Sequence, residues 1–286
     1  MISEFWQQVV SDGLQVPRQR SIGDLTVELT EMLGNPDPSV RDGVAFPALA
    51  TWIGQGVYDD LLVGLGDGMA VGLGQGLGES DTDSVFIRSF SALVLAECID
   101  RDSRARLLPP AKVLHWGDRI ATWLLAERDE RGFVPGKGWA HAIAHGADAI
   151  GALGRSDRIG AAELTALLDV VLERLTVPTR EFWVAGEPDR LAQAAMAILR
   201  RDELGLDAVE TWATRVGEAA VPAGDEQHHP YWVAGNVQAF LRSLHLQLSL
   251  SSPQPACRAD LLLVLIDQLR ASNPYYLGKL PGHRRD

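Results

Sequence analysis

Residues 21–36 read SIGDLTVELTEMLGNP, and this stretch sets the pattern that decides the fold. Ser21 followed by Asp24 is typical of a helix start, because a serine side chain can accept a hydrogen bond from a backbone N–H of the first turn. The apolar side chains that follow are spaced to share one helix face: Leu25, Leu29 and Met32. Gly34-Asn35-Pro36 is a typical helix stop. The stretch therefore predicts an amphipathic helix that ends in a short polar break.

The same alternation of helix and break recurs along the chain. The segment Asp37-Pro38-Ser39 opens another helix, in which Pro47 is expected to cause a kink. Its apolar residues are spaced for burial: Val40, Val44 and Leu49. Residues 37–42 resemble the second helix of a HEAT repeat. Further helices are expected at about 83–99, 110–128, 139–154, 160–175, 188–202, 205–219, 231–250 and 256–271.

No stretch combines strict alternation with the Val, Ile and Thr enrichment that is typical of strands. Helices of this length with short connections normally pack as antiparallel neighbours. With 46% hydrophobic residues the chain can bury a substantial core. The sequence predicts a single all-α domain over residues 1–286, an irregular HEAT-like or armadillo-like stack of antiparallel helix pairs.

Residues 64–78 read GLGDGMAVGLGQGLG and are unusually rich in glycine. Each glycine weakens a helix by about 0.8–1 kcal/mol relative to alanine. A phosphate-binding loop is not favoured, because no Walker lysine follows and no strand precedes. We expect a pliable connector whose apolar side chains enter the core: Leu65, Met69, Val71, Leu73 and Leu77.

The formal net charge is −12, with 26 basic residues against 38 acidic ones. Duplex binding needs clustered lysine and arginine side chains that displace counterions from phosphates. The basic residues are scattered here, and the basic C-terminal tail at about 279–286 is expected to be solvated. We therefore expect no nucleic-acid partner.

The chain has no run of 18 apolar residues, so we expect no membrane span. Its first residues lack the basic-then-apolar order of a secretory signal. Cys98 and Cys257 lie far apart and form no CxxC spacing, which excludes a cysteine zinc site. Two buried, reduced thiols are typical of a cytosolic protein, and a cytoplasmic location is expected.

Residues 138–148 read GWAHAIAHGAD and carry the most distinctive polar pattern. A helix is expected from Trp139 onward, after a turn-rich loop. On that helix His141, His145 and Asp148 stand at positions i, i+4 and i+7, within about 60° of one another. Two imidazoles and a carboxylate would therefore project as one stripe, flanked by small residues.

Three interpretations of this stripe remain open. The histidines could ligate zinc with Asp148 as a third ligand, although Ala142 stands where metalloproteases of the HExxH type have their glutamate. Alternatively, His145 is a general acid or base whose pKa is tuned by Asp148 or His141. In the third interpretation the stripe is structural, with imidazoles that bond to a neighbouring helix.

Residues around the stripe could bind a ligand. Lys137 lies between two glycines at the expected helix start, where backbone N–H groups and the positive helix end favour an anion. Trp139 and Arg131 are expected to contact the same ligand, although Arg131 could equally be a solvated charge.

Two further segments place charges near apolar sequence. Arg88 lies in the apolar row 86–91 and needs a partner, since an unpaired buried charge is prohibitive. The candidate partners are Asp148, Glu127 and Asp42. Such a pair would fix helix register; alternatively, Arg88 is an anion clamp. At 186–191, the acidic Glu187 and Asp189 suit a helix start, while Arg190 could meet a substrate carboxylate or Asp148.

Three stretches stand out beyond their chemistry: 86–90 (FIRSF), 131–148 (which contains RGF and GWAHAIAHGAD) and 186–191 (GEPDRL). Through them, about residues 20–250 resemble an uncharacterised bacterial family catalogued as domain of unknown function 2785. The resemblance implies a bacterial helical protein and assigns no activity. Where the family reads Gly-Glu-Asp before Arg-Leu, a proline precedes Asp189 and shifts the acidic residue.

The leading hypothesis is an enzyme or binding protein that acts on a small polar or anionic molecule. Hydrolysis, elimination and cyclisation all use an acid or base of the kind that His145 would supply, oriented by His141 and Asp148. The expected ligand contacts are Lys137, Trp139, Arg88, Arg131, Glu187, Asp189 and Arg190. No cofactor is predicted, apart from zinc as the alternative above. The rival hypothesis is a helical-repeat scaffold for a protein partner, without catalytic activity.

Overall fold

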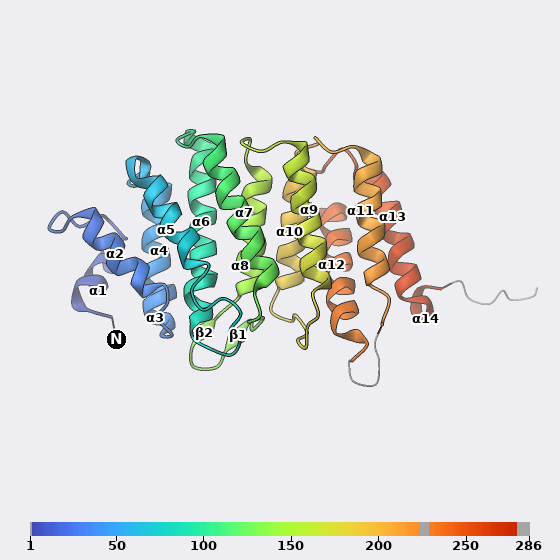
Figure 1. Cartoon of the computed structure of the whole chain (residues 1–286), viewed down its shortest axis with the longest axis horizontal. Helices are drawn as coiled ribbons and strands as arrows, with labels where there is room; N and C mark the ends of the chain where they lie inside the picture. The colour runs from blue at the N-terminus through green and yellow to red at the C-terminus, as the bar shows by residue number, and fades with distance from the viewer. Residues whose placement is uncertain (1, 224–228, 279–286) are drawn as a thin grey trace, which may run out of the picture. The chain divides into compact units, whose positions relative to one another are not determined.

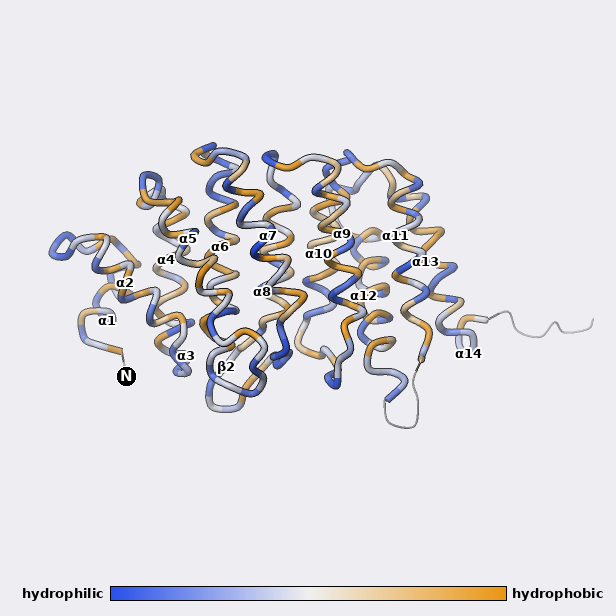
Figure 2. Tube along the Cα trace, viewed as in Figure 1, coloured by the Kyte–Doolittle hydropathy of each residue, from blue (hydrophilic) through white to orange (hydrophobic). Residues whose placement is uncertain are grey.

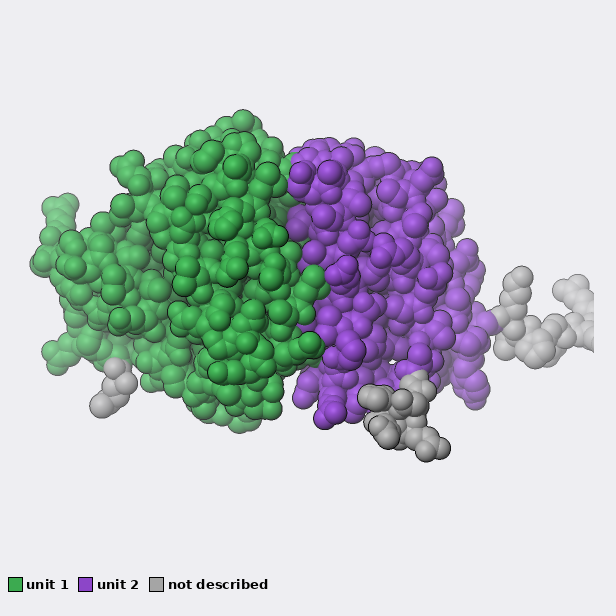
Figure 3. All heavy atoms as spheres, in the orientation of Figure 1, with its two compact units in different colours: residues 1–159 green, residues 160–286 purple. Residues whose placement is uncertain are grey.

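The computed structural model describes residues 2–223 and 229–278, which divide after Ile159 into two compact units (Figure 3). The single domain over 1–286 stays a prediction, and the basic tail at 279–286 lies outside the described residues.

In the described part of the first unit, the regular elements are helices and one small hairpin (Figure 1). Its helices are α1 (Glu4–Ser11), α2 (Ile22–Met32), α3 (Pro38–Val40), α4 (Phe46–Gly54), α5 (Leu62–Gly72), α6 (Ser84–Ala105), α7 (Pro110–Ala126) and α8 (Ala142–Arg155). A π-helical turn (Arg41–Ala45) joins α3 to α4, and a 3₁₀ turn (Asp59–Leu61) precedes α5. The hairpin pairs strands β1 (Phe133–Val134) and β2 (Gly138–Trp139) in antiparallel fashion.

The described part of the second unit is helical as well. Its helices are α9 (Ala161–Thr176), α10 (Glu187–Leu199), α11 (Leu206–Ala219), α12 (Tyr231–Leu250), α13 (Arg258–Ser272) and α14 (Pro274–Leu277). The predicted all-α class is confirmed, and the expected helices from 83 to 271 are present with ends shifted by a few residues. The larger shifts are at α6, which continues to Ala105, at α8, which begins at Ala142, and at α10, which ends at Leu199.

The helix predicted at residues 21–34 forms as its sequence indicates. The Ser21 side chain accepts a hydrogen bond from the backbone N–H of Asp24 at 3.1 Å. Leu25 and Leu29 are fully buried, whereas Met32 is only half-buried. Capping and burial on one face therefore decide this helix.

The kink expected at Pro47 takes the form of the π-helical turn. Proline has no N–H to donate and crowds the preceding turn. Phe46 instead bonds to the carbonyl five residues back, on Arg41, which widens the helix just before Pro47. The residues predicted for burial are buried: Val40, Val44 and Leu49.

Within each unit, helices two apart along the chain pack against each other. In the first unit α4 packs on α6, α6 on α8, and α5 on α7. In the second unit α10 packs on α12, α9 on α11, and α11 on α13. Figure 2 shows hydrophobic residues recurring along these helices between hydrophilic ones, as expected for helices buried on one face.

The glycine-rich segment differs from the connector that was predicted. Most of it is not a connector but helix α5, followed by turns at 73–78. A Cβ on Gly66 would overlap the indole of Trp116 on α7, and one on Gly72 would overlap the hydroxyl of Ser91 on α6. The glycines therefore let α5 approach its neighbours closely, which offsets their low helix propensity.

Only some of the apolar side chains of this segment are buried. Leu65, Met69 and Leu73 are buried as predicted, whereas Val71 and Leu77 are exposed, contrary to the prediction. Val71 lies on the side of α5 that faces solvent.

Cys98 is buried and Cys257 half-buried, and both are free thiols. No described helix has the length and apolar character needed to span a membrane.

Close packing predicts opposite effects for two glycines of α5. Gly66→Ala should lower the free energy of unfolding by about 1–3 kcal/mol, because the added methyl group displaces Trp116. Gly68 is exposed, and a Cβ there would meet no atom within 4 Å. Gly68→Ala should therefore raise the free energy of unfolding by about 0.5–1 kcal/mol. Urea unfolding measures both; a stabilising Gly66→Ala would contradict this packing.

Candidate functional site

A hairpin leads into the helix that carries the histidines. Strand β1 pairs with β2, and the N–H groups of Ala140 and His141 continue the pairing by donating to the carbonyls of Gly132 and Arg131 at 2.8 and 3.1 Å. Helix α8 begins at Ala142. The expected helix start at Trp139 is therefore wrong.

His141 is the residue that caps α8, and its backbone is left-handed, with φ of 51°. A non-glycine residue in this region is strained by about 1–3 kcal/mol, and such residues cluster at ligand and catalytic sites. The imidazole stacks on the Trp139 indole, with ring centroids 4.3 Å apart and planes 20° apart. The Phe133 ring meets the edge of the same indole at 5.0 Å.

His145 lies one turn into α8 and is only 6% exposed. Its ring is 5.8 Å from that of His141 and 5.0 Å from that of Phe90, edge-on in both cases. The predicted proximity of the two imidazoles is thus observed, although one residue belongs to the helix and the other to its cap. Asp148 follows on α8 and is half-buried.

Ser89 of α6 fixes the orientation of the His145 ring. The Ser89 hydroxyl donates its proton to the carbonyl oxygen of Ala140 and lies 2.7 Å from Nδ1 of His145. A hydroxyl has a single proton to donate, and a carbonyl oxygen has none. The proton between Ser89 and His145 must therefore come from Nδ1. In a neutral ring this leaves the lone pair on Nε2.

Arg88, the neighbour of Ser89, forms a fully buried ion pair with Glu127. Its Nε and Nη2 donate to the two carboxylate oxygens at 2.7 and 2.9 Å, and its Nη1 reaches the Gln75 and Gly76 carbonyls. Glu127 also accepts from the indole of Trp123 at 2.9 Å. Of the partners considered, Glu127 is the one present, and this geometry favours the structural interpretation of Arg88 over the anion clamp.

The two other cationic residues predicted to contact the ligand in the first unit, Arg131 and Lys137, are paired as well. Arg131 makes a bidentate contact with the buried carboxylate of Asp129, at 2.8 and 2.6 Å. Hydrogen bonding to Asp129 raises the pKa of the Arg131 guanidinium. Lys137 lies in the hairpin turn instead of at the helix start, and its Nζ is 2.6 Å from the Asp83 carboxylate. This last pair is half exposed on both sides.

Arg41, in the π-helical turn, contacts the backbone of the hairpin. Its side chain is fully buried, and its guanidinium lies 4.1 Å from the centre of the Phe86 ring. Nη2 donates to the carbonyl oxygens of Lys137 and Trp139 at 2.8 and 3.4 Å. Burial lowers the pKa of this guanidinium, an effect that Asp42 opposes.

Gly138 makes this approach possible. It has φ of 77°, and a Cβ on it would lie 3.2 Å from Nη2 of Arg41 and 3.0 Å from Cβ of Pro38. Glycine is thus required both by the backbone conformation and by the space available.

The remaining predicted ligand contacts belong to the second unit, at the start of α10. Glu187 is buried and accepts from the backbone N–H of Ala185 at 2.8 Å. Asp189 is exposed and accepts from the Ser243 hydroxyl at 2.7 Å. Burial lowers the pKa of the half-buried Arg190. The acidic pair thus stands in the first turn of α10, as the helix-start interpretation expects.

Within the described residues, no group of three or more His, Cys, Asp or Glu side chains is arranged to hold a metal ion. The zinc interpretation of the stripe therefore gains no support from the geometry.

Comparison with known proteins gives one family. Residues 73–246 match the family described as Protein of unknown function (DUF2785). The chain belongs to this family. No curated protein and no solved structure matches the chain. The matched part of the DUF2785 chain contains every residue predicted for the site, from Arg88 to Arg190, whereas Arg41 precedes it.

Sequence reasoning missed two residues that hold the candidate site in place. Ser89 lies in the apolar row 86–91, where a small hydroxyl draws less notice than the neighbouring arginine. Arg41 meets the hairpin across 96 residues of sequence. The available signal was that Arg41, like Arg88, is a charge among residues spaced for burial.

Removing the Ser89 hydroxyl should weaken the fold of this DUF2785 protein. Ser89→Ala leaves the Ala140 carbonyl and Nδ1 of His145 without this partner in a buried site, so we expect a loss of about 1–3 kcal/mol in the free energy of unfolding. Ser91 is a matched control on the same helix, because its buried hydroxyl has no hydrogen-bond partner among the described residues. Ser91→Ala should change stability by less than about 0.5 kcal/mol or raise it. Equal losses for the two variants would contradict the assigned hydrogen bonds.

The Arg88–Glu127 pair predicts a larger effect. Glu127→Gln keeps the shape of the side chain but leaves a buried guanidinium uncompensated, which should lower the free energy of unfolding by about 3–5 kcal/mol. Asp59 makes a bidentate contact of the same kind with Arg101, but both side chains are partly exposed. Asp59→Asn should therefore cost less than about 1 kcal/mol. Chemical denaturation distinguishes the two variants. A loss for Glu127→Gln as small as that for Asp59→Asn would contradict the structural role of the Arg88–Glu127 pair.

Proposed function

We propose that the segment Gly138–Asp148 binds a small polar or anionic molecule and that His145 exchanges a proton with it. The observation that supports this most directly is the contact between Nδ1 of His145 and the Ser89 hydroxyl. A histidine whose Nδ1 is held by a neighbouring group presents Nε2 in a defined chemical state. That is the preparation that acid–base chemistry requires.

In the neutral ring, Nε2 would accept a proton from the bound molecule. In the imidazolium form both ring nitrogens carry protons, and Nε2 would return one. His141 and Asp148 are proposed to orient the ligand and to stabilise the charged ring. Elimination, cyclisation and hydrolysis all use such a group, and the proposal needs no cofactor.

The aromatic stack offers a contact surface beside the histidine. Trp139 is 42% exposed and stacks on His141. The strained backbone of His141 supports the proposal, because strain of this kind is retained where a particular geometry is needed. Trp139 is therefore the proposed ligand contact, placed by the hairpin and by Arg41.

Lys137 is the proposed anion contact. Its ion pair with Asp83 is half exposed, and pairs of this kind contribute about 0–1 kcal/mol. A ligand anion can therefore replace Asp83 at little cost. Arg88 and Arg131 are proposed to hold the segment in place through their ion pairs with Glu127 and Asp129, without touching the ligand. Contact of the ligand with Glu187, Asp189 or Arg190 stays a prediction.

For the fold, we propose an irregular HEAT-like stack of antiparallel helix pairs. The support is the packing of every second helix within each unit, which is typical of two-layered helical repeats. A bacterial origin and a cytoplasmic location also stay predictions.

A second candidate function is a scaffold for a protein partner. The observation that favours it is the exposure of two large aromatic side chains on one hairpin, 56% for Phe133 and 42% for Trp139. Exposed aromatic residues of this kind often anchor protein interfaces.

Ligand-dependent stability separates the two functions. Thermal unfolding is measured with a panel of phosphates, carboxylates and sugar phosphates, and any molecule that protects the wild type is repeated with His145→Gln and Ser91→Ala. A ligand at 100 times its Kd should stabilise by about 2.7 kcal/mol. We expect protection to be lost in His145→Gln and kept in Ser91→Ala.

Two outcomes would contradict the enzyme-like site. One is protection that is unchanged in His145→Gln. The other is a panel without any protective molecule, combined with melting temperatures several degrees lower for both His145→Gln and Asp148→Asn, because this pattern indicates structural histidines.

A further inference from the structure

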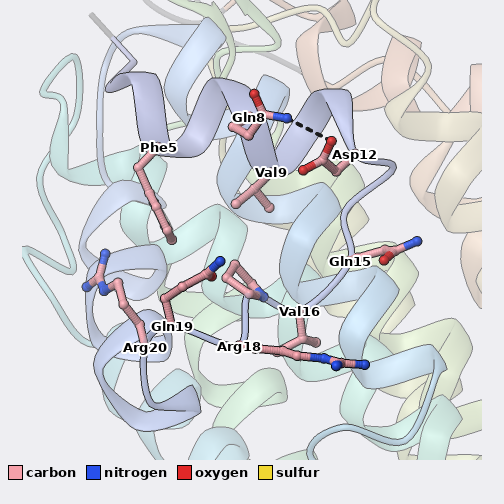
Figure 4. A pocket seen from close by; sticks show the side chains of 10 residues that line it. Phe5, Gln8, Val9, Asp12, Gln15, Val16, Arg18, Gln19 and Arg20 are labelled. Carbon is pink, nitrogen blue, oxygen red and sulfur yellow. Dashed lines mark hydrogen bonds between the residues drawn. The ribbon is translucent and has the colours of Figure 1, made fainter.

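A separate hollow lies near the N-terminus, in the first unit and outside the residues that match the family (Figure 4). It has a volume of about 650 Å³ and lies between α1 and the segment that leads to α2. This volume falls within the range of about 300–1,000 Å³ that small-molecule sites occupy.

The apolar part of the lining comes from both sides of the hollow. Figure 4 shows Phe5 and Val9 of α1 on one side and Val16 on the other. Pro17 adds a further apolar surface. A ligand would therefore place an apolar group between the helix and the segment.

The polar part of the lining is cationic and rich in amides. Arg18 is exposed and forms no ion pair among the described residues. The amide side chains of Gln15 and Gln19 likewise make no hydrogen bond within the described part of the chain. Asp12, the acidic residue of the lining, accepts a hydrogen bond from Gln8 at 2.8 Å. An unpaired guanidinium with neighbouring amide donors suits a carboxylate.

Contacts at both ends of the segment between α1 and α2 hold the walls of the hollow. The indole of Trp52 donates to the Leu14 carbonyl at 2.6 Å, which fixes the segment at its start. Arg20 pairs with Glu28 at 2.7 Å and lies over the Phe5 ring at 5.0 Å, which fixes the other end against α1. A site that is formed before the ligand arrives loses less conformational freedom on binding.

We propose that this hollow binds an organic carboxylate that carries an apolar group, with Arg18 as its carboxylate contact. The apolar group lies against Phe5, Val9 and Val16, and the amide of Gln19 bonds to a polar group of the ligand. The same chemistry is offered by a free organic acid and by the C-terminal residue of a peptide.

Calorimetry with matched probes on the full chain tests this. N-acetylphenylalanine has the carboxylate, an amide and an apolar ring, and N-acetylphenylalaninamide differs in lacking the charge. We expect saturable binding of the acid, with the amide at least about tenfold weaker. A tetrapeptide of three alanines and a C-terminal phenylalanine distinguishes the sources: tighter binding than the acid identifies a peptide end, and equal or weaker binding a free acid.

Variants assign the binding to this hollow. Arg18→Gln should weaken the acid at least about tenfold and leave the melting temperature unchanged, because Arg18 is an exposed residue without an ion pair. Arg104→Gln, at an exposed arginine of α6, should leave binding unchanged. No saturable binding of the acid, equal affinity for acid and amide, or an Arg18→Gln variant that binds like the wild type would each overturn the proposal. None of these results depends on His145.

Discussion

Two adjacent residues of α6 hold both ends of the segment on which the proposed site depends. Arg88 forms an ion pair with Glu127, where α7 ends and the segment 127–141 begins. Ser89 donates to the carbonyl of Ala140 and accepts from Nδ1 of His145, where the segment ends and α8 begins. Removing one partner of a buried bidentate pair strongly destabilises a fold. The stability of the unit therefore depends on the position of the segment. The geometry of the histidines follows from this constraint.

The hairpin within this segment has strands of two residues each and is too short to be stable alone. Arg41 supports it from another part of the chain by donating to the carbonyls of Lys137 and Trp139, and Gly138 leaves the space for this contact. The hairpin in turn sets Trp139 against His141. Substitutions far from His145 in sequence can therefore alter the stack beside it.

The sequence predicted the helices well because each carries its own periodicity and end signals. Ser21, for example, caps α2 as its hydroxyl suggests. The errors arise where distant contacts override local preference. Glycines in α5 are tolerated because Trp116 and Ser91 occupy the space of missing side chains, and propensity alone does not report that. The helix start moved from Trp139 to Ala142 because Gly132 and Arg131 bond to the residues between. The pair His141 and His145 was predictable from spacing, whereas Ser89 was not, because a serine in an apolar helix gives no sign of its partner.

The protonation of the His145 ring is the feature that links this framework to chemistry. Nitrogen-15 NMR of the imidazole, with the histidines labelled, reports which ring nitrogen carries the proton in the neutral form. We predict the proton on Nδ1, because the Ser89 proton is already given to Ala140. A neutral His145 protonated on Nε2 would contradict the account, since Ser89 would then have to donate to the ring and release the Ala140 carbonyl.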